Sequence, residues 1–460
     1  MSSKGPGREG APGFSLARAW RQSHGTGRFV PKGSTMRRLL PLLSLLLLAF
    51  SAPAAAAETV VIHAGRLIAE AGKPAAGPST IVVADGRIVS VAPGLAPPPA
   101  GARLIDLSTK TVLPGLIDTH VHLTGNPGEP FWKEAVEPDE WSTLVGAHNA
   151  LVTARAGFTT VRDLGSGRLN GFALRRALDE GLIPGPRLLA AGQALSTIGG
   201  HGDVSGFRPE VAAALDGHNT CTGPDECAAK VREAAKLGAD VIKFHATGGV
   251  LSQGDKSLGQ AFTDAEMRAI VETAHNLGLK VAAHAHADAG IAAAVRAGVD
   301  SIEHGTFASA ATIQLMKQRG TVLVPTLMAF TGIRERLGRG IYTPIVEDKV
   351  RMTLSEVGKA ARLARAAGVP IVFGTDAGVY EHGRNAGEFA QLVEIVGMSP
   401  AEALAAATTG AAKLLGLDRE IGRIAPGYSA DLIAVSGDPL RDVRVLEHVD
   451  YVMVKGRTIQ

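Results

Sequence analysis

The feature that most constrains the fold is a repeated alternation of short apolar runs with longer Ala-rich stretches. Eight runs have the composition of buried strands, at residues 112–122, 158–163, 187–192, 240–245, 280–286, 301–304, 321–326 and 370–375. Between them lie stretches typical of helices, such as 224–237, 263–277, 287–297, 309–319 and 347–367. Eight β-then-α units in succession are what a (β/α)8 TIM barrel requires.

The alternative within the α/β class is a doubly wound open sheet, which also alternates strands with helices. Such a sheet often carries a Gly-x-Gly-x-x-Gly turn after its first strand, and no such turn follows residues 112–122. The barrel is therefore the predicted fold. Its functional side chains are expected at the C-terminal ends of the strands.

Both ends of the globular part have short β-type runs joined by turns. Near the start, Val60-Val-Ile-His63 and Ser79-Thr-Ile-Val-Val83 are such runs, and Asp85-Gly86 is a hairpin turn. Similar runs return at 431–435 and 449–454. We predict one small β-sandwich built from both chain ends. The expected domains are 58–112 and 421–460 for the sandwich, and 113–420 for the barrel.

The residues before Glu58 have the pattern of a signal peptide. Met36-Arg-Arg38 is followed by an apolar run at 39–50 and then by small residues up to Ala57. An apolar run this short is typical of a cleaved leader rather than a membrane span. We expect a signal peptide at 36–57 and export, either to a bacterial periplasm or out of the cell. Residues 1–35 are interpreted as a non-native or disordered extension ahead of a true start at Met36.

The formal net charge of +3 does not indicate nucleic-acid binding. Eight of the 47 basic residues but one of the 44 acidic residues precede Glu58, which leaves 39 basic and 43 acidic residues in the rest of the chain. That part contains no basic cluster of the kind that binds nucleic acid or a membrane surface. The expected partner is therefore a small-molecule substrate, with neither nucleic acid nor, after leader cleavage, membrane.

The chain has two cysteines, Cys221 and Cys227, in one loop. In the oxidising compartment predicted above, an isolated pair this close is expected to form a disulfide. A metal-binding role would need further ligands close in sequence, and none is nearby. We therefore predict a disulfide that restrains this loop.

Several strand ends carry side chains that can bind metals. In the run at 112–122, His120 and His122 point to the same face because side chains alternate along a strand. A single histidine at the end of a strand does not indicate a metal, because such residues are common and a hydrogen bond in the core explains them. Convergence of five strands at one level of a barrel instead predicts a metal centre. The side chains concerned are His120, His122, Lys243, His284, His286, His304 and Asp376.

Lys243 lies within the apolar run Val241-Ile-Lys-Phe244. A lysine that points into a barrel must be paired, neutral or modified. Its neutral amine can add carbon dioxide, and the resulting carbamate is an anion able to bridge two cations. On the residues alone, an ion pair between Lys243 and an aspartate is the alternative.

This combination of ligands resembles the amidohydrolase superfamily with two metals and a carboxylated lysine, and the resemblance extends over residues 58–460. Three motifs resemble its Xaa-Pro dipeptidase (prolidase-like) branch, which includes ochratoxin-hydrolysing amidohydrolases. They are Thr197-Ile-Gly-Gly-His-Gly-Asp203, Ser301-Ile-Glu-His-Gly305 and Gly374-Thr-Asp-Ala-Gly-Val-Tyr-Glu-His-Gly-Arg-Asn385. The resemblance implies a hydrolase of amide bonds that forms a homo-oligomer, such as an octamer.

The resemblance also implies two divalent metal ions. Zinc is the expected metal because a histidine-rich site with few carboxylates suits it. His284 is taken as a ligand because it lies deeper in its strand than His286. The alternative is that His286 is the metal ligand and His284 faces the substrate. The first ion would be held by His120, His122 and Asp376, the second by His284 and His304, and carboxylated Lys243 would bridge both.

In the implied mechanism a hydroxide shared by the two ions attacks the substrate carbonyl. Asp376 would accept its proton and pass it to the leaving nitrogen, and His286 would stabilise the oxyanion. For a loop residue alone, a hydrogen bond that stabilises the loop is the alternative reading. The side chains expected to contact a substrate are His201, Val250, Leu251, His286, His382 and Arg384.

The predicted function is hydrolysis of dipeptides or N-acyl amino acids with a free C-terminal carboxylate, ochratoxin A being one candidate. One alternative is a cyclic-amide hydrolase resembling imidazolonepropionase, which would not need Lys243. Another is a non-catalytic periplasmic metal-binding protein, against which the complete ligand set with Asp376 argues.

Of the other polar residues, His245 is assigned to packing or solvent, and Arg162 with Asp163 to a structural contact.

Overall fold

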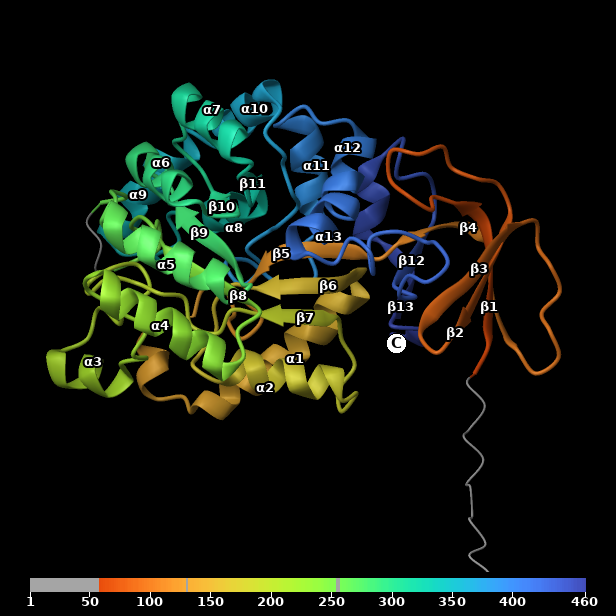
Figure 1. Ribbon diagram of the computed structural model, residues 1–460, viewed down its shortest axis with the longest axis horizontal. Helices are drawn as coiled ribbons and strands as arrows, with labels where there is room; N and C mark the ends of the chain where they lie inside the picture. Colours follow the sequence, from red (N-terminus) through yellow and green to blue (C-terminus); the bar gives the residue numbers. More distant parts are fainter. Residues whose placement is uncertain (1–57, 130, 254–256) are drawn as a thin grey trace, which may run out of the picture. The chain divides into compact units, whose positions relative to one another are not determined.

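Figure 1 shows the computed structural model, which describes residues 58–129, 131–253 and 257–460. The upstream extension at 1–35 and the signal peptide at 36–57, both predicted above, lie outside the described residues. Across the described part of the chain, none of the helices combines the length and the apolar character that a membrane crossing requires.

Strands from both chain ends form one β-rich unit, as predicted. Its seven-stranded sheet has the order β14-β13-β12-β4-β1-β2-β3. Asp85 and Gly86 have φ angles of 51° and 72°, the backbone that a tight hairpin between β2 and β3 needs. β4 connects the two halves, because it pairs in parallel with β1 and antiparallel with β12. The bounds are β1 Val60–Leu67, β2 Ser79–Ala84, β3 Arg87–Pro93, β4 Arg103–Pro114, β12 Leu432–Val435, β13 Val449–Val454 and β14 Arg457–Thr458.

The remaining strands form two parallel sheets, β5-β6-β7 and β11-β10-β9-β8. Next to β7, Leu195 forms a parallel bridge with Phe244 of β8. At the other edge, the segment 370–377 bridges Leu323 of β11 and Val121 of β5. The two sheets are thereby joined into the predicted (β/α)8 barrel. The bounds are β5 Leu116–Val121, β6 Phe158–Asp163, β7 Arg187–Ala190, β8 Val241–His245, β9 Lys280–Ala285, β10 Ser301–His304 and β11 Val322–Val324.

The eighth predicted strand, 370–375, is not a regular strand in the structure. Ile371 and Ala377 form isolated bridges, and the residues between them have no ladder of their own. Pro370 has no N–H to donate, and Asp376 has a left-handed backbone with φ of 61°. The segment nevertheless occupies the eighth position of the barrel.

Helices surround the barrel strands (Figure 1). The predicted helix at 347–367 is wrong as a single element, because Gly358 with φ of 75° separates α9 from α10. The capping box at Thr263 is confirmed, since Thr263 Oγ1 accepts from the Glu266 N–H and Glu266 accepts from the Thr263 N–H. The α-helices are α1 Asp139–Arg155, α2 Asn170–Asp179, α3 Pro209–Leu215, α4 Pro224–Leu237, α5 Asp264–Asn276, α6 Asp288–Ala297, α7 Ala310–Arg319, α8 Leu327–Arg336, α9 Pro344–Leu354, α10 Lys359–Ala367, α11 Gly387–Glu394, α12 Pro400–Ala406 and α13 Thr409–Leu415, with 3-10 turns η1 Phe131–Ala135 and η2 Val443–Glu447.

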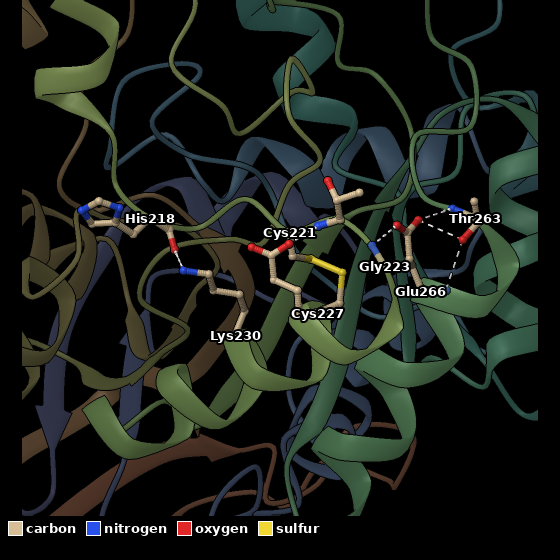
Figure 2. The surroundings of a disulfide bond; sticks show 9 residues. His218, Cys221, Gly223, Cys227, Lys230, Thr263 and Glu266 are labelled. Carbon is tan, nitrogen blue, oxygen red and sulfur yellow. Dashed lines mark hydrogen bonds between the residues drawn. A yellow bond between two sulfur atoms is a disulfide. The ribbon is translucent and has the colours of Figure 1, made fainter.

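The predicted disulfide between Cys221 and Cys227 is present at the start of α4 (Figure 2). The Cys221 N–H donates to the Ser196 carbonyl at 3.0 Å, close to where the chain leaves the barrel. The Asn219 side chain donates to the Gly202 carbonyl at 2.9 Å. The disulfide loop therefore supports the segment 196–203, which carries His201.

Candidate metal centre

A cavity at the C-terminal ends of the barrel strands is lined by all six predicted metal ligands. Its volume is about 230 Å³. One side of its lining is ionisable and the other is apolar. The lining residues are His120, His122, His201, Lys243, His245, Val250, Leu251, His284, His286, His304, Ala329, Phe330, Ile333, Asp376 and Val379.

The first ligand group consists of His120, His122 and Asp376, whose ligand atoms lie within 4.8 Å of one another. Asp376 Oδ1 is 3.4 Å from His120 Nε2 and 3.3 Å from His122 Nε2. The opposite ring nitrogens are held in place, since His120 Nδ1 lies 2.8 Å from Glu303 and His122 Nδ1 lies 2.9 Å from the Gly165 carbonyl. Both Nε2 atoms are therefore directed at one point, as metal ligands require.

The second group consists of His284, His286 and His304, again with ligand atoms within 4.8 Å. His286 Nδ1 is 2.8 Å from Thr306 Oγ1, and His304 Nδ1 is 2.7 Å from Thr326 Oγ1. His284 Nε2 is buried and bonds to none of the described residues. A buried nitrogen without a partner is costly, and a bound cation would satisfy it.

Left-handed backbone conformations occur at three positions of the site. His304, Thr326 and Asp376 have φ angles of 70°, 49° and 61°. Glu303 bonds His120 inside the barrel, so strand alternation alone would direct the next residue, His304, away from the centre. The left-handed turn at His304 brings its ring back to the cavity. Strained backbone of this kind is common at functional sites.

Lys243 points into the barrel, as predicted, and is 2% exposed. Its Nζ lies 3.5 Å from His120 Nε2. Burial lowers the pKa of Lys243 to about 8, and the nearby Glu303 and Asp376 carboxylates offset part of this effect. No carboxylate among the described residues lies within ion-pair distance of Nζ, so the structure does not contain the Lys–Asp pair considered as the alternative.

Glu303 and Arg162 form a buried pair that the sequence reasoning missed. Arg162 Nη2 lies 3.1 Å from Glu303, and both side chains are at most 1% exposed. Although burial raises the pKa of Glu303, the Arg162 charge and the His120 hydrogen bond lower it to about 2. The expected Arg162–Asp163 contact is wrong, since Asp163 accepts instead from the Leu123 and Gly165 N–H groups. Strand alternation in Ser301-Ile-Glu303 could have placed Glu303 in the interior.

His201 lies in the cavity, as predicted for a substrate contact. Its Nδ1 is 2.5 Å from Ser252 Oγ, and its ring centroid is 4.5 Å from that of His284. His245, which the sequence reasoning assigned to packing or solvent, also lines the cavity. Its ring lies 4.6 Å from that of His201, and its Nδ1 is buried without a described partner.

The apolar wall contains the two predicted residues, Val250 and Leu251. Lys349 of α9 holds the loop that carries them, since its Nζ donates to the Gly249 and Ser252 carbonyls at 2.7 and 2.9 Å. The wall is completed by residues that the sequence reasoning did not select, and these are Ala329, Phe330, Ile333 and Val379. No sequence pattern indicates these residues, because α8 and the segment after Asp376 meet only in the folded barrel.

The structure does not bring His382 and Arg384 to this cavity, which corrects their prediction as substrate contacts. His382 Nε2 lies 3.1 Å from the Gly125 carbonyl. Arg384 is half-exposed and forms ion pairs with Glu335 and Glu381 at 2.8 and 2.9 Å. A guanidinium already paired with two carboxylates outside the cavity is not positioned to hold a substrate there.

The donor set fits two divalent cations. Each group offers imidazole nitrogens, one adds a carboxylate, and most of the ligands are oriented by a hydrogen bond at their other ring nitrogen. Such nitrogen-rich sites suit zinc and similar transition metals. Lys243 lines the same cavity as both groups, where a carboxylated side chain could reach them.

Comparisons with known proteins agree with this geometry. The family model described as the amidohydrolase family matches residues 111–459. The ochratoxinase of Aspergillus niger is 31% identical over 358 residues, which cover 72% of this chain and 71% of the relative. Among solved structures, a Xaa-Pro dipeptidase with bound methionine in the active site matches with a TM-score of 0.80 and 37% identity, over 87% of this chain and 99% of that one. A prolidase complexed with N-methylphosphonate-L-proline matches with a TM-score of 0.79 and 32% identity, over 87% and 99% of the two chains.

Proposed function

Because this chain belongs to the amidohydrolase family and is a hydrolase of amide bonds, we propose that it cleaves the bond joining an acyl group to a C-terminal amino acid. The substrates are dipeptides or N-acyl amino acids with a free carboxylate. The main support is the meeting of two ligand groups in one cavity whose lining also contains Lys243 and several apolar side chains.

In this proposal two divalent ions occupy the centre, with zinc as the expected metal. His120, His122 and Asp376 would hold one, and His284 with His304, from the group that also contains His286, would hold the other. As a neutral amine, Lys243 could add carbon dioxide, with formation of an N–C bond and loss of a proton, and the resulting carbamate would offer oxygen donors to the same ions. The lowered pKa of Lys243, about 8, favours the neutral amine that this reaction needs.

When bound, the ions would lower the pKa of a shared water and polarise the scissile carbonyl. Asp376 faces this point from the first group and would accept the proton of the attacking water and return it to the leaving nitrogen. His286, with Nδ1 held by Thr306, would donate from Nε2 to the oxyanion. A buried cavity makes such hydrogen bonds stronger than they are in water.

The apolar wall would receive the side chain of the released amino acid, with Val250, Leu251 and Phe330 in contact. Of the polar side chains expected to contact a substrate, His382 and Arg384 lie outside the cavity and His286 faces the oxyanion, which leaves His201 to hold the carboxylate. Relatives with similar chemistry support this choice, since one solved relative has methionine in its active site and another an L-proline phosphonate. Ochratoxin A is a candidate substrate on the basis of the Aspergillus niger relative.

The test is a mass-spectrometric cleavage panel on the zinc-loaded protein, in which each free acid is paired with its C-terminal amide. Xaa-Pro and Xaa-hydrophobic dipeptides, N-acyl amino acids and ochratoxin A make up the panel. We expect cleavage of the acids and little of the amides. Equal cleavage of both would contradict carboxylate recognition and favour a cyclic-amide hydrolase. No cleavage, together with unchanged metal binding in Lys243→Ala and Asp376→Asn variants, would favour a non-catalytic metal-binding protein.

A further inference from the structure

The first turn of α8 lies beside the second ligand group and is held by a residue from another helix. Thr326 occupies the N-cap position of α8, where a threonine hydroxyl commonly accepts from the first N–H groups of the helix. Its hydroxyl is used differently here, since Thr326 Oγ1 lies 2.7 Å from Nδ1 of the proposed ligand His304. The N–H groups at this helix end therefore require another acceptor.

Glu388 of α11 supplies that acceptor. Its Oε1 accepts from the Leu327 N–H at 2.9 Å, and its Oε2 accepts from the Met328 N–H at 2.7 Å. Leu327 and Met328 are the two residues that follow Thr326, and the Glu388 side chain is fully buried against them. Glu388 therefore caps α8 from outside the helix and leaves the Thr326 hydroxyl to His304.

The backbone at Thr326 needs this support. Its φ angle is 49°, a left-handed conformation that a β-branched residue seldom adopts. Such a conformation persists where the surrounding structure holds it in place. The two hydrogen bonds to Glu388 fix the residues immediately after Thr326, and they thereby fix the direction in which its hydroxyl meets His304.

Further contacts between α11 and α8 keep Glu388 in place. Gln391, three residues after Glu388, donates to Thr331 Oγ1 at 2.8 Å. A Cβ atom at Gly387 would lie 2.8 Å from the Met328 sulfur, which is closer than a van der Waals contact allows. The two helices therefore approach closely at this point, and the start of α11 fixes where α8 begins.

We propose that Glu388 is a positioning residue for the second metal ion, and that it acts on His304 through the first turn of α8 and Thr326. It acts at a distance, because its two oxygens bond the backbone of α8 rather than His304. The rings of the first group are held by other elements, through Glu303 and the Gly165 carbonyl. The inference rests on the two-ion centre of the proposed function and does not depend on which amide is cleaved.

Stepwise zinc affinities of the full-length protein, measured by competition with a chelator, test the inference. In Glu388→Gln the side-chain amide keeps one oxygen acceptor and turns a donor towards the other N–H group. We expect the weaker zinc affinity, assigned to the second group, to fall by about three- to tenfold, and the tighter one to stay within about twofold. Glu394→Gln, the same substitution at an exposed position on α11, is the matched control and should change neither affinity.

A double-mutant cycle with Thr326→Val tests the path. If Glu388 acts through Thr326, Glu388→Gln should weaken the second ion by less than about twofold when Thr326→Val is already present. Equal losses in both backgrounds would overturn the inference while the two-ion centre stands. An unchanged weaker affinity in Glu388→Gln, or an equal fall in both affinities, would do the same. Binding of one zinc ion or none by the unsubstituted protein would overturn both.

A second variant separates positioning from folding. Glu388→Asp keeps both oxygens but shortens the side chain by one methylene, and it should show the same selective loss of the second ion. In both variants, excess zinc should restore cleavage of the best substrate to within about twofold of the unsubstituted protein, because mass action refills the second group. A loss of activity that excess zinc does not restore, or failure of both variants to fold, would overturn the inference, since Glu388 would then serve the barrel as a whole.

Discussion

The two ligand groups of the centre differ in what holds them. His120 of the first group is oriented by a carboxylate, Glu303, which is itself paired with Arg162 in a fully buried network. The rings of His286 and His304 in the second group are oriented by the neutral hydroxyls of Thr306 and Thr326. A carboxylate makes the imidazole a stronger ligand than a hydroxyl does, and a buried charge network is also more costly to disrupt. The first group should therefore be the tighter and less tolerant half of the centre.

The largest effect is expected at Asp376, which serves the first group as a ligand and the reaction as a base. Asp376→Asn should lower kcat by about 10³-fold, within the range for loss of a general base. Steady-state kinetics on the best substrate of the panel would measure this, with metal content determined on the same sample. Asp264→Asn, at the exposed N-terminus of α5, is the control. A loss of less than tenfold would remove Asp376 from the chemistry.

Breaking the support of the first group should destabilise the whole barrel. Glu303→Gln leaves the Arg162 guanidinium buried without its countercharge, which should cost about 3–5 kcal/mol in the free energy of unfolding. Urea denaturation of the metal-free protein measures this, and Glu356→Gln on the surface is the control. Metal affinity should also fall, by about 10- to 100-fold. A stability change below about 1 kcal/mol would mean that the pair is not the main support of this group.

The same pair makes a prediction about pH. Arg162 and His120 hold the pKa of Glu303 at about 2, below its usual value of 4.5. Because the folded-state pKa is the lower one, this stabilisation is complete above pH 4.5 and is lost as the pH falls from there towards 2. In the metal-free protein, the free energy of unfolding should therefore fall less steeply over this window in Glu303→Gln than in the unsubstituted chain. Parallel curves would contradict the assigned pKa.

The smallest effects are expected in the second group. Thr326→Val and Thr306→Val each remove one hydroxyl from a histidine while keeping the side-chain shape, and should cost about 1 kcal/mol of stability. Affinity for the second metal should fall by about tenfold in Thr326→Val, because His304 is a proposed ligand, and should stay unchanged in Thr306→Val, because His286 is not. Competition with a chelator would measure both. If either threonine variant lost more affinity than Glu303→Gln, the comparison between the two groups would be reversed.

Much of the centre was predictable because strand periodicity fixes which side chains share a face. The pairs His120 and His122, and His284 and His286, follow from alternation alone, and Lys243 was expected inside because its neighbours are apolar. Long-range contacts were not predictable in this way. The Arg162–Glu303 pair joins strands 141 residues apart, and the apolar wall joins α8 to the segment after Asp376.

The incorrect predictions have physical reasons too. Arg384 follows the last barrel segment, as a substrate contact would, but no local pattern indicates that Glu335 and Glu381 pair with it. The left-handed backbone at His304 and Asp376 depends on the surrounding packing, and neither residue is a glycine that would reveal it. His245 was assigned to packing or solvent although it shares a strand face with Lys243, and that face lines the cavity.

The most direct test of the central claim is the metal stoichiometry of the purified protein and of its Lys243→Ala variant, measured by inductively coupled plasma mass spectrometry. Two ligand groups beside Lys243 predict two divalent ions per chain in the unsubstituted protein. The Lys243→Ala variant should bind at most one ion, which the first group retains. Two ions in Lys243→Ala would contradict a bridging role for the lysine. One ion or none in the unsubstituted protein after zinc loading would contradict the binuclear centre itself.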